Sequence, residues 1–157
     1  MKKAKVFDAV TIILLLILAV LIYCVIQLKV LHKPYINLFG HTVFQVITGS
    51  MEDTIKINDV VIVKITKDVN VNDIITYEDS GNYVTHRVIR QTADELVTKG
   101  DANNAEDDPI KIDRVVGKVV FILTNVSVWI NVFKTPKVII AIIVSIILLS
   151  ILFKKKM

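Results

Sequence analysis

Ser50 is the first candidate for chemistry in this sequence, because it follows Gly49 at the end of a largely apolar run, residues 43–48. A glycine there lets the backbone turn sharply and approach another segment closely, so the turn can present the hydroxyl outward. A serine hydroxyl becomes a nucleophile when a neighbouring base accepts its proton. A Gly-Ser pair after a strand is nevertheless more often only a turn, and both interpretations stay open at this point.

His86 is the second candidate, because a neutral imidazole can act as a general base near pH 7. Strand alternation places His86 on one face with Val84 and Val88, and it places Thr85 and Arg87 on the other. A histidine that shares a face with valines is more often a half-buried structural residue than a base. The sequence alone therefore leaves both roles open.

A polar loop, residues 99–109, is the third candidate, because it holds four carboxylates within eight residues. A solvated turn would explain it, and a metal-binding loop is an alternative. The spacing differs from that of an EF-hand, which needs ligands at alternate positions, a central glycine and a distal glutamate. With His86 as its only soft ligand, a zinc site is poorly supported. We expect neither a metal nor another cofactor.

The segment that carries these residues is predicted to be a small β domain. Short runs rich in Val, Ile and Thr are bounded by Asn, Asp and Gly, which is typical of strands and turns. We expect a mainly β, mostly antiparallel domain with a thin core. The predicted strands are residues 41–48, 60–66, 74–77, 83–91, 95–98 and 115–123.

Two apolar runs flank this segment and raise the apolar fraction of the chain to 54%. Residues 9–26 contain no charge, and residues 138–153 contain no charge and two serines. A helix needs about 20 mostly apolar residues to cross a bilayer. We therefore predict two transmembrane helices, the second extended by Thr135 and Pro136, with an interfacial helix as its alternative. A cleaved signal is disfavoured for the first run, because no small-x-small site follows.

The net charge of +4 divides unevenly along the chain. Residues 1–34 carry five lysines and one aspartate, residues 134–157 carry five lysines, and the remainder has nine basic and fourteen acidic residues. The positive charge therefore belongs to the membrane flanks, and we expect no nucleic-acid partner. Six lysines at the chain ends against four at the inner flanks predict cytoplasmic termini by the positive-inside rule.

These observations predict a multi-pass protein of the cell membrane in three parts. Residues 1–33 form a cytoplasmic N-terminus and the first transmembrane helix, residues 34–133 an extracytoplasmic β-rich domain, and residues 134–157 the second helix and a lysine-rich cytoplasmic end. The single cysteine, Cys24, lies in the first predicted span. An internal disulfide is therefore impossible, and a thiol nucleophile is disfavoured.

Four short blocks follow one another in the middle of the chain. They are Thr-Gly-Ser-Met-Glu-Asp-Thr at 48–54, Asn-Asp-Val-Val-Ile-Val at 58–63, His-Arg-Val at 86–88 and Lys-Gly-Asp-Ala-Asn at 99–103. In this order, between two apolar runs, they resemble the blocks of the type I signal peptidases. The match is to the ER-type branch with a Ser-His pair, found in Gram-positive bacteria, archaea and eukaryotes, and especially to its SipW-like members. The resemblance covers about residues 43–120.

Three positions depart from the family pattern. Asp53 stands where the family usually has proline, and Thr48 and Asn58 replace a serine and a glycine. Thr48 keeps a hydroxyl, so its implied role is retained. Asp53 adds charge and removes backbone rigidity near the site, two changes that bear on rate and specificity. The assignment to the ER-type branch depends on His86, because the bacterial housekeeping branch has a lysine base in that block.

The resemblance implies a catalytic assignment for each block. Ser50 is the nucleophile and His86 its general base. An aspartate holds the imidazole, with Asp101 the first candidate by the motif match. Asp107 is the second, and Asp108 is its close rival because the loop length is uncertain. The oxyanion donors are the Thr48 hydroxyl and the backbone N–H of Ser50.

The same resemblance implies a membrane-bound serine endopeptidase, signal peptidase I, that removes signal peptides from exported precursor proteins. Its partners are those precursors and the lipid bilayer, and partner subunits stay unknown. The same site would also serve a protease acting on membrane-bound regulators. The alternative of another class is a non-catalytic membrane-anchored β domain, a sensor or assembly subunit, in which Ser50, His86 and Asp101 are turn and core residues. Convergence of these groups discriminates between the two classes.

Overall fold

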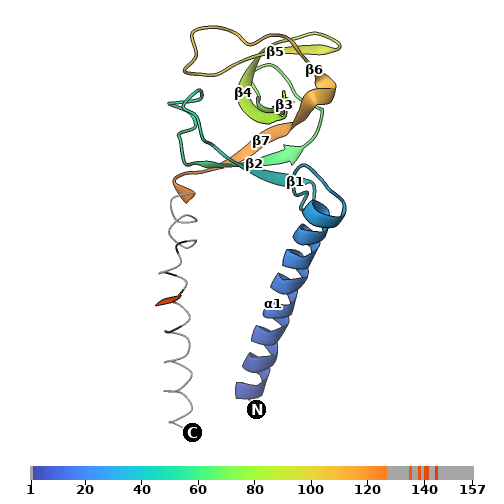
Figure 1. Ribbon diagram of the computed structural model, residues 1–157, viewed down its shortest axis with the longest axis vertical. Coiled ribbons are helices and arrows are strands. Elements are labelled where there is room, and N and C mark those ends of the chain that lie inside the picture. Colours follow the sequence, from blue (N-terminus) through green and yellow to red (C-terminus); the bar gives the residue numbers. More distant parts are fainter. Residues whose placement is uncertain (1, 127–134, 136–137, 139, 142–143, 145–157) are drawn as a thin grey trace.

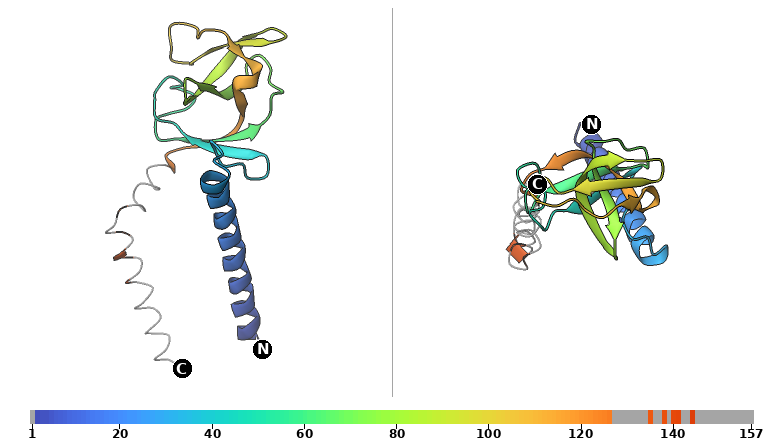
Figure 2. Two further views of the ribbon diagram at one scale, coloured as in Figure 1. Left: turned by 45° about the vertical axis from the view of Figure 1, so that its right-hand side comes forward. Right: turned by 90° about the horizontal axis from the view of Figure 1, so that it is seen from above.

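The computed structural model describes residues 2–126, 135, 138, 140, 141 and 144 of the chain. Within this part, one long helix leads into a curled antiparallel sheet, and the helix projects away from the sheet (Figure 1). The views in Figure 2 show the same arrangement from two other directions. The mainly β class predicted from the sequence is confirmed. The domain boundaries at residues 34 and 133 stay predictions.

The helix, α1 (Lys2–Val25), continues into a π-helical turn, η1 (Ile26–Val30). Apolar side chains along it are exposed, and Leu16 and Leu21 are 62% and 57% exposed. In the described part of the chain, no helix combines the length and the apolar character needed to cross a membrane. The two predicted spans are therefore not confirmed, and most of the second, residues 138–153, falls outside the described residues.

The end of η1 is fastened to the segment that precedes the sheet. Gln27 is buried, donates its side-chain amide to the Asn37 carbonyl at 2.9 Å and accepts from the Asn37 N–H at 3.0 Å. Between them in sequence, Tyr35 places its ring 6.2 Å from Phe44 and 6.0 Å from Tyr83. The helix end is thus linked to a small aromatic cluster on the sheet.

The described residues form a seven-stranded sheet in the order β1-β2-β7-β3-β4-β5-β6, with every neighbouring pair antiparallel. The strands and the 3₁₀ turn are β1 (His41–Gln45), β2 (Val60–Ile65), β3 (Ile74–Asp79), β4 (Asn82–Gln91), β5 (Glu95–Lys99), β6 (Ile110–Lys111), η2 (Ile112–Arg114) and β7 (Val115–Leu123). β1 lies next to α1, and β5 and β6 lie at the far end of the domain (Figure 1).

Each of the six predicted strands corresponds to an observed strand, and the short β6 was not predicted. β1 ends at Gln45, three residues before the predicted end. Val46 still exchanges backbone hydrogen bonds with the chain before β2, donating to Asp59 at 2.9 Å and accepting from Asn58 at 3.0 Å. The chain then leaves the sheet. A turn, rather than a strand that continues to residue 48, therefore leads to Ser50.

Two hydrophobic clusters support the sheet. One lies among β3 to β7 and the loop before β3, and its buried members are Val69, Ile75, Tyr77, Val88, Leu96, Ile110 and Val115. The other joins β2 to the turn after β1, and its buried members are Met51, Ile55, Val61 and Val63. Full burial of each such side chain contributes about 1.5–3 kcal/mol. The second cluster therefore ties the turn that carries Ser50 to the sheet.

Candidate active site

The turn after β1 exposes Ser50 because its neighbour is anchored in the core. Met51 is 2% exposed, and its carbonyl accepts hydrogen bonds from Thr54 at 3.0 Å and Ile55 at 2.8 Å. With Met51 directed inward, Ser50 lies half-buried at the surface of the turn. Its Oγ lies 3.4 Å from the Oγ1 of Thr48. Two residues predicted to act together thus place their hydroxyls side by side.

The loop after β5 packs directly against this turn. The backbone N–H of Ala102 donates to the Ser50 carbonyl at 2.9 Å. A Cβ added to Gly100 would come within 2.5 Å of the same carbonyl, so this close approach requires glycine. The glycine of the predicted Lys-Gly-Asp block therefore has a packing role, because it lets the loop lie directly against the backbone of Ser50.

The turn into β2 explains one departure from the family pattern. Asn58 has φ +76°, a left-handed conformation that glycine adopts freely and that asparagine tolerates better than most residues. Asp59 is buried, and its carboxylate accepts from the N–H groups of Lys56 and Asn125, both at 2.9 Å. Asparagine in place of glycine therefore preserves the turn.

His86 lies on β4 and faces the sheet interior, as the alternation predicts. It is 7% exposed, and its Nδ1 lies 2.6 Å from the Oδ2 of Asp107. An ionised carboxylate can only accept hydrogen bonds, so Nδ1 carries the proton and donates. In the neutral imidazole Nε2 then keeps a lone pair, which is the state a general base requires.

Asp107 is held in place by residues of two strands. Its backbone N–H donates to the Thr98 carbonyl at 2.8 Å, and its Oδ2 accepts from the Thr98 hydroxyl at 2.7 Å and from the Tyr77 hydroxyl at 3.3 Å. Burial is the main cause that raises the pKa of Tyr77 to about 12. Neither Tyr77 nor Thr98 was predicted to belong to the site.

The sequence offers one signal that points to Thr98. In β5 the side chains alternate, and Leu96 and Thr98 are both fully buried. A threonine in the buried phase of a strand must satisfy its hydroxyl with a partner. That partner comes from a loop whose path the strand pattern does not reveal.

Asp101 lies against a different group. Its carboxylate accepts from Arg87 Nε at 2.8 Å and from a terminal guanidinium nitrogen at 2.6 Å, and it accepts from the Thr54 hydroxyl at 2.5 Å. The hydrogen bonds from Arg87 are the main cause that lowers the pKa of Asp101. The first candidate for the imidazole partner therefore bridges β4 to the turn after β1, while Asp107 contacts His86. Asp108 is exposed to solvent.

One cleft brings three of the predicted site residues together. It has a volume of about 630 Å³, and Thr48, Ser50 and His86 all line it. Phe44 and Tyr83, whose ring centroids lie 4.8 Å apart, form part of its apolar wall. Ser50 reaches the cleft from the turn and His86 from β4, so residues 36 positions apart in the sequence share one space.

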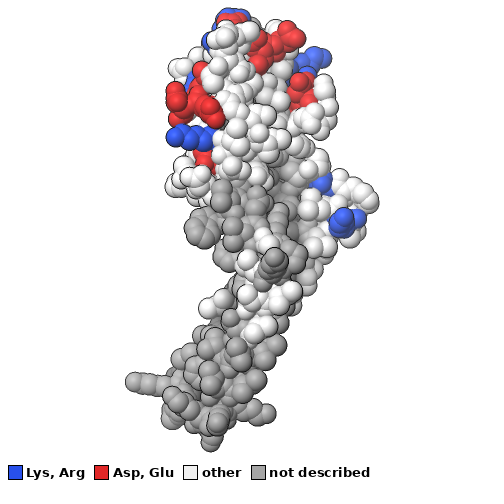
Figure 3. Space-filling model, turned by 60° about the vertical axis from the view of Figure 1, so that its left-hand side comes forward, with Lys and Arg blue, Asp and Glu red and all other residues white. Residues whose placement is uncertain are grey.

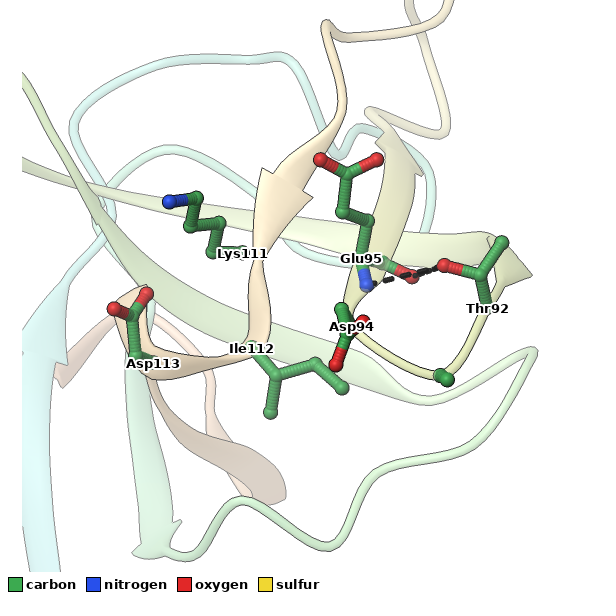
Figure 4. A pocket seen from close by; sticks show the side chains of 7 residues that line it. Thr92, Asp94, Glu95, Lys111, Ile112 and Asp113 are labelled. Atoms are coloured by element: carbon green, nitrogen blue, oxygen red, sulfur yellow. Dashed lines mark hydrogen bonds between the residues drawn. The ribbon is translucent and has the colours of Figure 1, made fainter.

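A larger hollow, of about 730 Å³, lies by the β4–β5 turn and β6. Figure 4 shows its charged and polar lining, which includes Asp94, Glu95 and Lys111. It contains no residue of the four sequence blocks, so we assign the chemistry to the smaller cleft.

Charges on the domain are of mixed sign. On the face shown in Figure 3, Lys and Arg side chains lie among Asp and Glu side chains over the part farthest from the chain ends. Among the residues that the structure describes, no group of three or more His, Cys, Asp or Glu side chains could hold a metal ion. The cleft itself offers hydroxyls and an imidazole, and the carboxylate of Asp107 contacts that imidazole at Nδ1.

Comparison with known proteins gives one informative similarity. No protein-family model matches the chain. The chain is similar to Signal peptidase I W of Bacillus subtilis (strain 168), with 38% identity over 86 residues. The match covers 49% of this chain and 45% of that protein, so the chain spans less than half of its relative's length. This partial similarity supports the signal peptidase I family.

Proposed function

We propose that this chain is a serine endopeptidase of the signal peptidase I type, which cuts exported precursor proteins at the end of their signal peptides. Ser50 is the nucleophile, His86 is the general base, and Asp107 orients the imidazole. The observation that carries the proposal is that Ser50 and His86 line one cleft while Nδ1 of His86 contacts the Asp107 carboxylate. The partial similarity to Signal peptidase I W suggests the substrate class.

The proposed reaction follows from the state of the imidazole. Nε2 of His86 accepts the Ser50 proton as Oγ attacks the scissile carbonyl carbon. The protonated imidazole then gives that proton to the leaving amine, which leaves an acyl ester on Ser50. Water, deprotonated by His86, hydrolyses the ester and restores the serine. In the free protein Ser50 Oγ contacts the Thr48 hydroxyl. The hydrogen bond from a nucleophile to its general base often forms fully only when substrate binds, and we expect this of Ser50 and His86.

The developing oxyanion needs donors placed in advance. We propose the Thr48 hydroxyl and the Ser50 N–H for this task, because the Thr48 Oγ1 lies next to the nucleophile. A donor of this kind is worth about 2.7–4 kcal/mol when it is removed. Thr48 is β-branched and therefore restricted at χ1, which favours a fixed donor over a mobile one.

The two aspartates take separate roles in this proposal. Asp107 stabilises the imidazolium that forms during attack, because it accepts from Nδ1. Asp101 instead fixes the turn of the nucleophile, since it accepts from Thr54 of that turn. Asp108 is exposed and has no part in the reaction.

We also propose that residues 9–26 and 138–153 anchor the chain in the cell membrane, with the β domain outside the cytoplasm. The two uncharged runs, the lysines beside them and the exposed apolar side chains of α1 support this placement. A substrate whose own apolar segment lies in the same bilayer then reaches the cleft at high effective concentration. The full chain should remain with the membrane pellet after an alkaline wash, and release into the supernatant would contradict the anchoring.

Cleavage of a precursor by the purified full chain in detergent tests the catalytic assignment. Ser50→Ala and His86→Ala should each lower kcat by about 10³-fold or more, because each removes a group that acts in the transition state. The control for Ser50 is Ser80→Gly: Ser80 lies in the β3–β4 turn with φ +50°, so glycine removes its hydroxyl without strain. The control for His86 is His41→Ala, at an exposed position on β1. Cleavage that persists in Ser50→Ala would contradict the proposal.

A further inference from the structure

The carboxylate of Asp107 is surrounded by donors from three adjacent strands. His86 lies on β4, and the sheet order places β3 and β5 on either side of it. Tyr77 of β3 pairs with Val84, and Thr98 of β5 pairs with Val88. Both partners lie two residues from His86, so all these side chains share one face of the sheet. The strand register itself therefore aims two hydroxyls at the group that contacts His86.

The protons of this cluster can be assigned from its distances. Thr98 Oγ1 lies 2.7 Å from Asp107 Oδ2 and 3.3 Å from the Tyr77 oxygen. Each hydroxyl has one proton to donate, and the carboxylate can only accept. The short contact and the charge both favour donation from Thr98 to Asp107. Tyr77, 3.3 Å from the same Oδ2, then donates its own proton there.

We propose that Tyr77 and Thr98 are positioning residues that hold Oδ2 of Asp107 in line with Nδ1 of His86. Asp107 lies on a loop, and its side chain is 21% exposed, so without these donors it can rotate toward water. Thr98 holds it at two points, with its hydroxyl on the carboxylate and its carbonyl on the backbone N–H. This inference rests on the proposed function, because it assigns the support of the proposed catalytic pair.

The state of Tyr77 suits this role. Its ring is buried, 3% exposed, and packs edge-on to His86 at a centroid distance of 6.4 Å. Burial is the main cause that raises the pKa of its hydroxyl to about 12. Tyr77 therefore keeps its proton over the whole range in which an imidazole works as a base, and it remains a donor to the carboxylate.

Two substitutions remove the hydroxyls with little change of shape, and a third restores one. Thr98→Val should lower kcat by about tenfold, because a hydrogen bond to a charged group is lost, and it should change KM by less than about twofold. Tyr77→Phe should lower kcat by about threefold, since its contact is longer. Thr98→Ser should keep kcat within about twofold of the wild type, because the hydroxyl returns.

Thr76→Val is the matched control. Thr76 is fully buried on β3, and its hydroxyl lies 2.8 Å from the Thr85 hydroxyl rather than near Asp107. This variant loses a buried hydroxyl from the same sheet, so any general loosening should be comparable to that of Thr98→Val. It should nevertheless keep the kcat of the wild type. An equal loss of kcat in Thr76→Val would overturn the proposal, because the effect would then be one of stability.

Nuclear magnetic resonance provides a readout that does not depend on cleavage. The chain has three histidines, so the Nδ1 proton of His86 can be assigned in the ¹⁵N-histidine-labelled full chain by its loss in His86→Ala. The signal should persist in Thr98→Ser and should shift and broaden by exchange in Thr98→Val. A wild-type signal together with a wild-type kcat in Thr98→Val would overturn the inference. Full cleavage by Ser50→Ala would instead refute the proposed function, whatever the histidine signal shows.

Discussion

Two aspartates of one loop, six positions apart, occupy contrasting environments. Asp107 accepts from an imidazole and from two buried strand residues, whereas Asp101 accepts from a guanidinium and from a hydroxyl of the turn after β1. The residue type is the same in both cases. The difference teaches that the role of each carboxylate is set by the partner that the sheet presents to it.

Strand alternation explains how this difference arises. His86 and Arg87 are consecutive residues of β4, so their side chains point to opposite faces. Each face receives one aspartate: Asp107 meets His86, and Asp101 meets Arg87. One loop after β5 therefore serves both faces of the same strand, with one contact inside the domain and the other beside the turn that carries Ser50.

Among the substitutions that test the contrast between the two aspartates, removal of the charge of Asp107 is expected to have the largest effect on kcat. Asp107→Asn should lower kcat by about 10³-fold or more, because an amide can hold the imidazole in the wrong tautomer and cannot stabilise the imidazolium. Precursor cleavage by the purified chain measures it. Asp108→Asn is the matched control, since Asp108 is the adjacent exposed carboxylate. If Asp108→Asn lost activity and Asp107→Asn kept it, the assignment of the two would be reversed.

Removal of the charge of Asp101 should affect stability more than the chemical step. Asp101→Asn removes the charge that faces Arg87 and replaces one of the two acceptor oxygens with an amide donor. The pair is only partly shielded, with the Asp101 and Arg87 side chains 18% and 29% exposed. We expect a loss of about 1–2 kcal/mol in the free energy of unfolding, after allowance for solvent screening. Denaturant unfolding of the full chain in detergent measures it. A drop in kcat as large as that of Asp107→Asn would erase the distinction between the two aspartates.

The smallest expected effect is the pH dependence of stability. Because the pKa of Asp101 is lowered in the folded state, the unfolded chain binds its proton more readily. The contribution is therefore fully present above the unfolded pKa, about 4. It is lost as the pH falls through the lower folded pKa. Unfolding at pH 7 and at pH 3 should show this loss in the wild type and a reduced loss in Asp101→Asn.

Glu106 provides the comparison for that experiment. Its pKa is also lowered, chiefly by hydrogen bonds from Arg90, but the pair is exposed to solvent. Water and salt screen such a pair, so Glu106→Gln should leave the pH dependence close to that of the wild type. If Glu106→Gln flattened it as much as Asp101→Asn does, shielding would not distinguish the two ion pairs.

Much of the fold follows from local patterns in the sequence. The alternating strands, the buried face of His86 and the surface turn at Ser50 depend on neighbours within a few residues. For that reason the six strands and the two blocks around Ser50 and His86 can be recognised without coordinates. The end of β1 was misplaced by three residues, because residues 46–48 keep a strand-like composition while the chain already turns toward Met51 and the core.

The sequence by itself determined a mainly β domain, the order of four chemical blocks and a short set of acidic candidates. Only the tertiary structure decided which carboxylate contacts which base, and which hydroxyls support that carboxylate. The physical reason is that alternation specifies the face of a side chain but not the path of a loop. The partners of Asp101, Asp107 and Asp108 depend on the course of the loop that begins at Gly100. That course depends in turn on close packing of Gly100 against the backbone of Ser50, which is distant in the sequence.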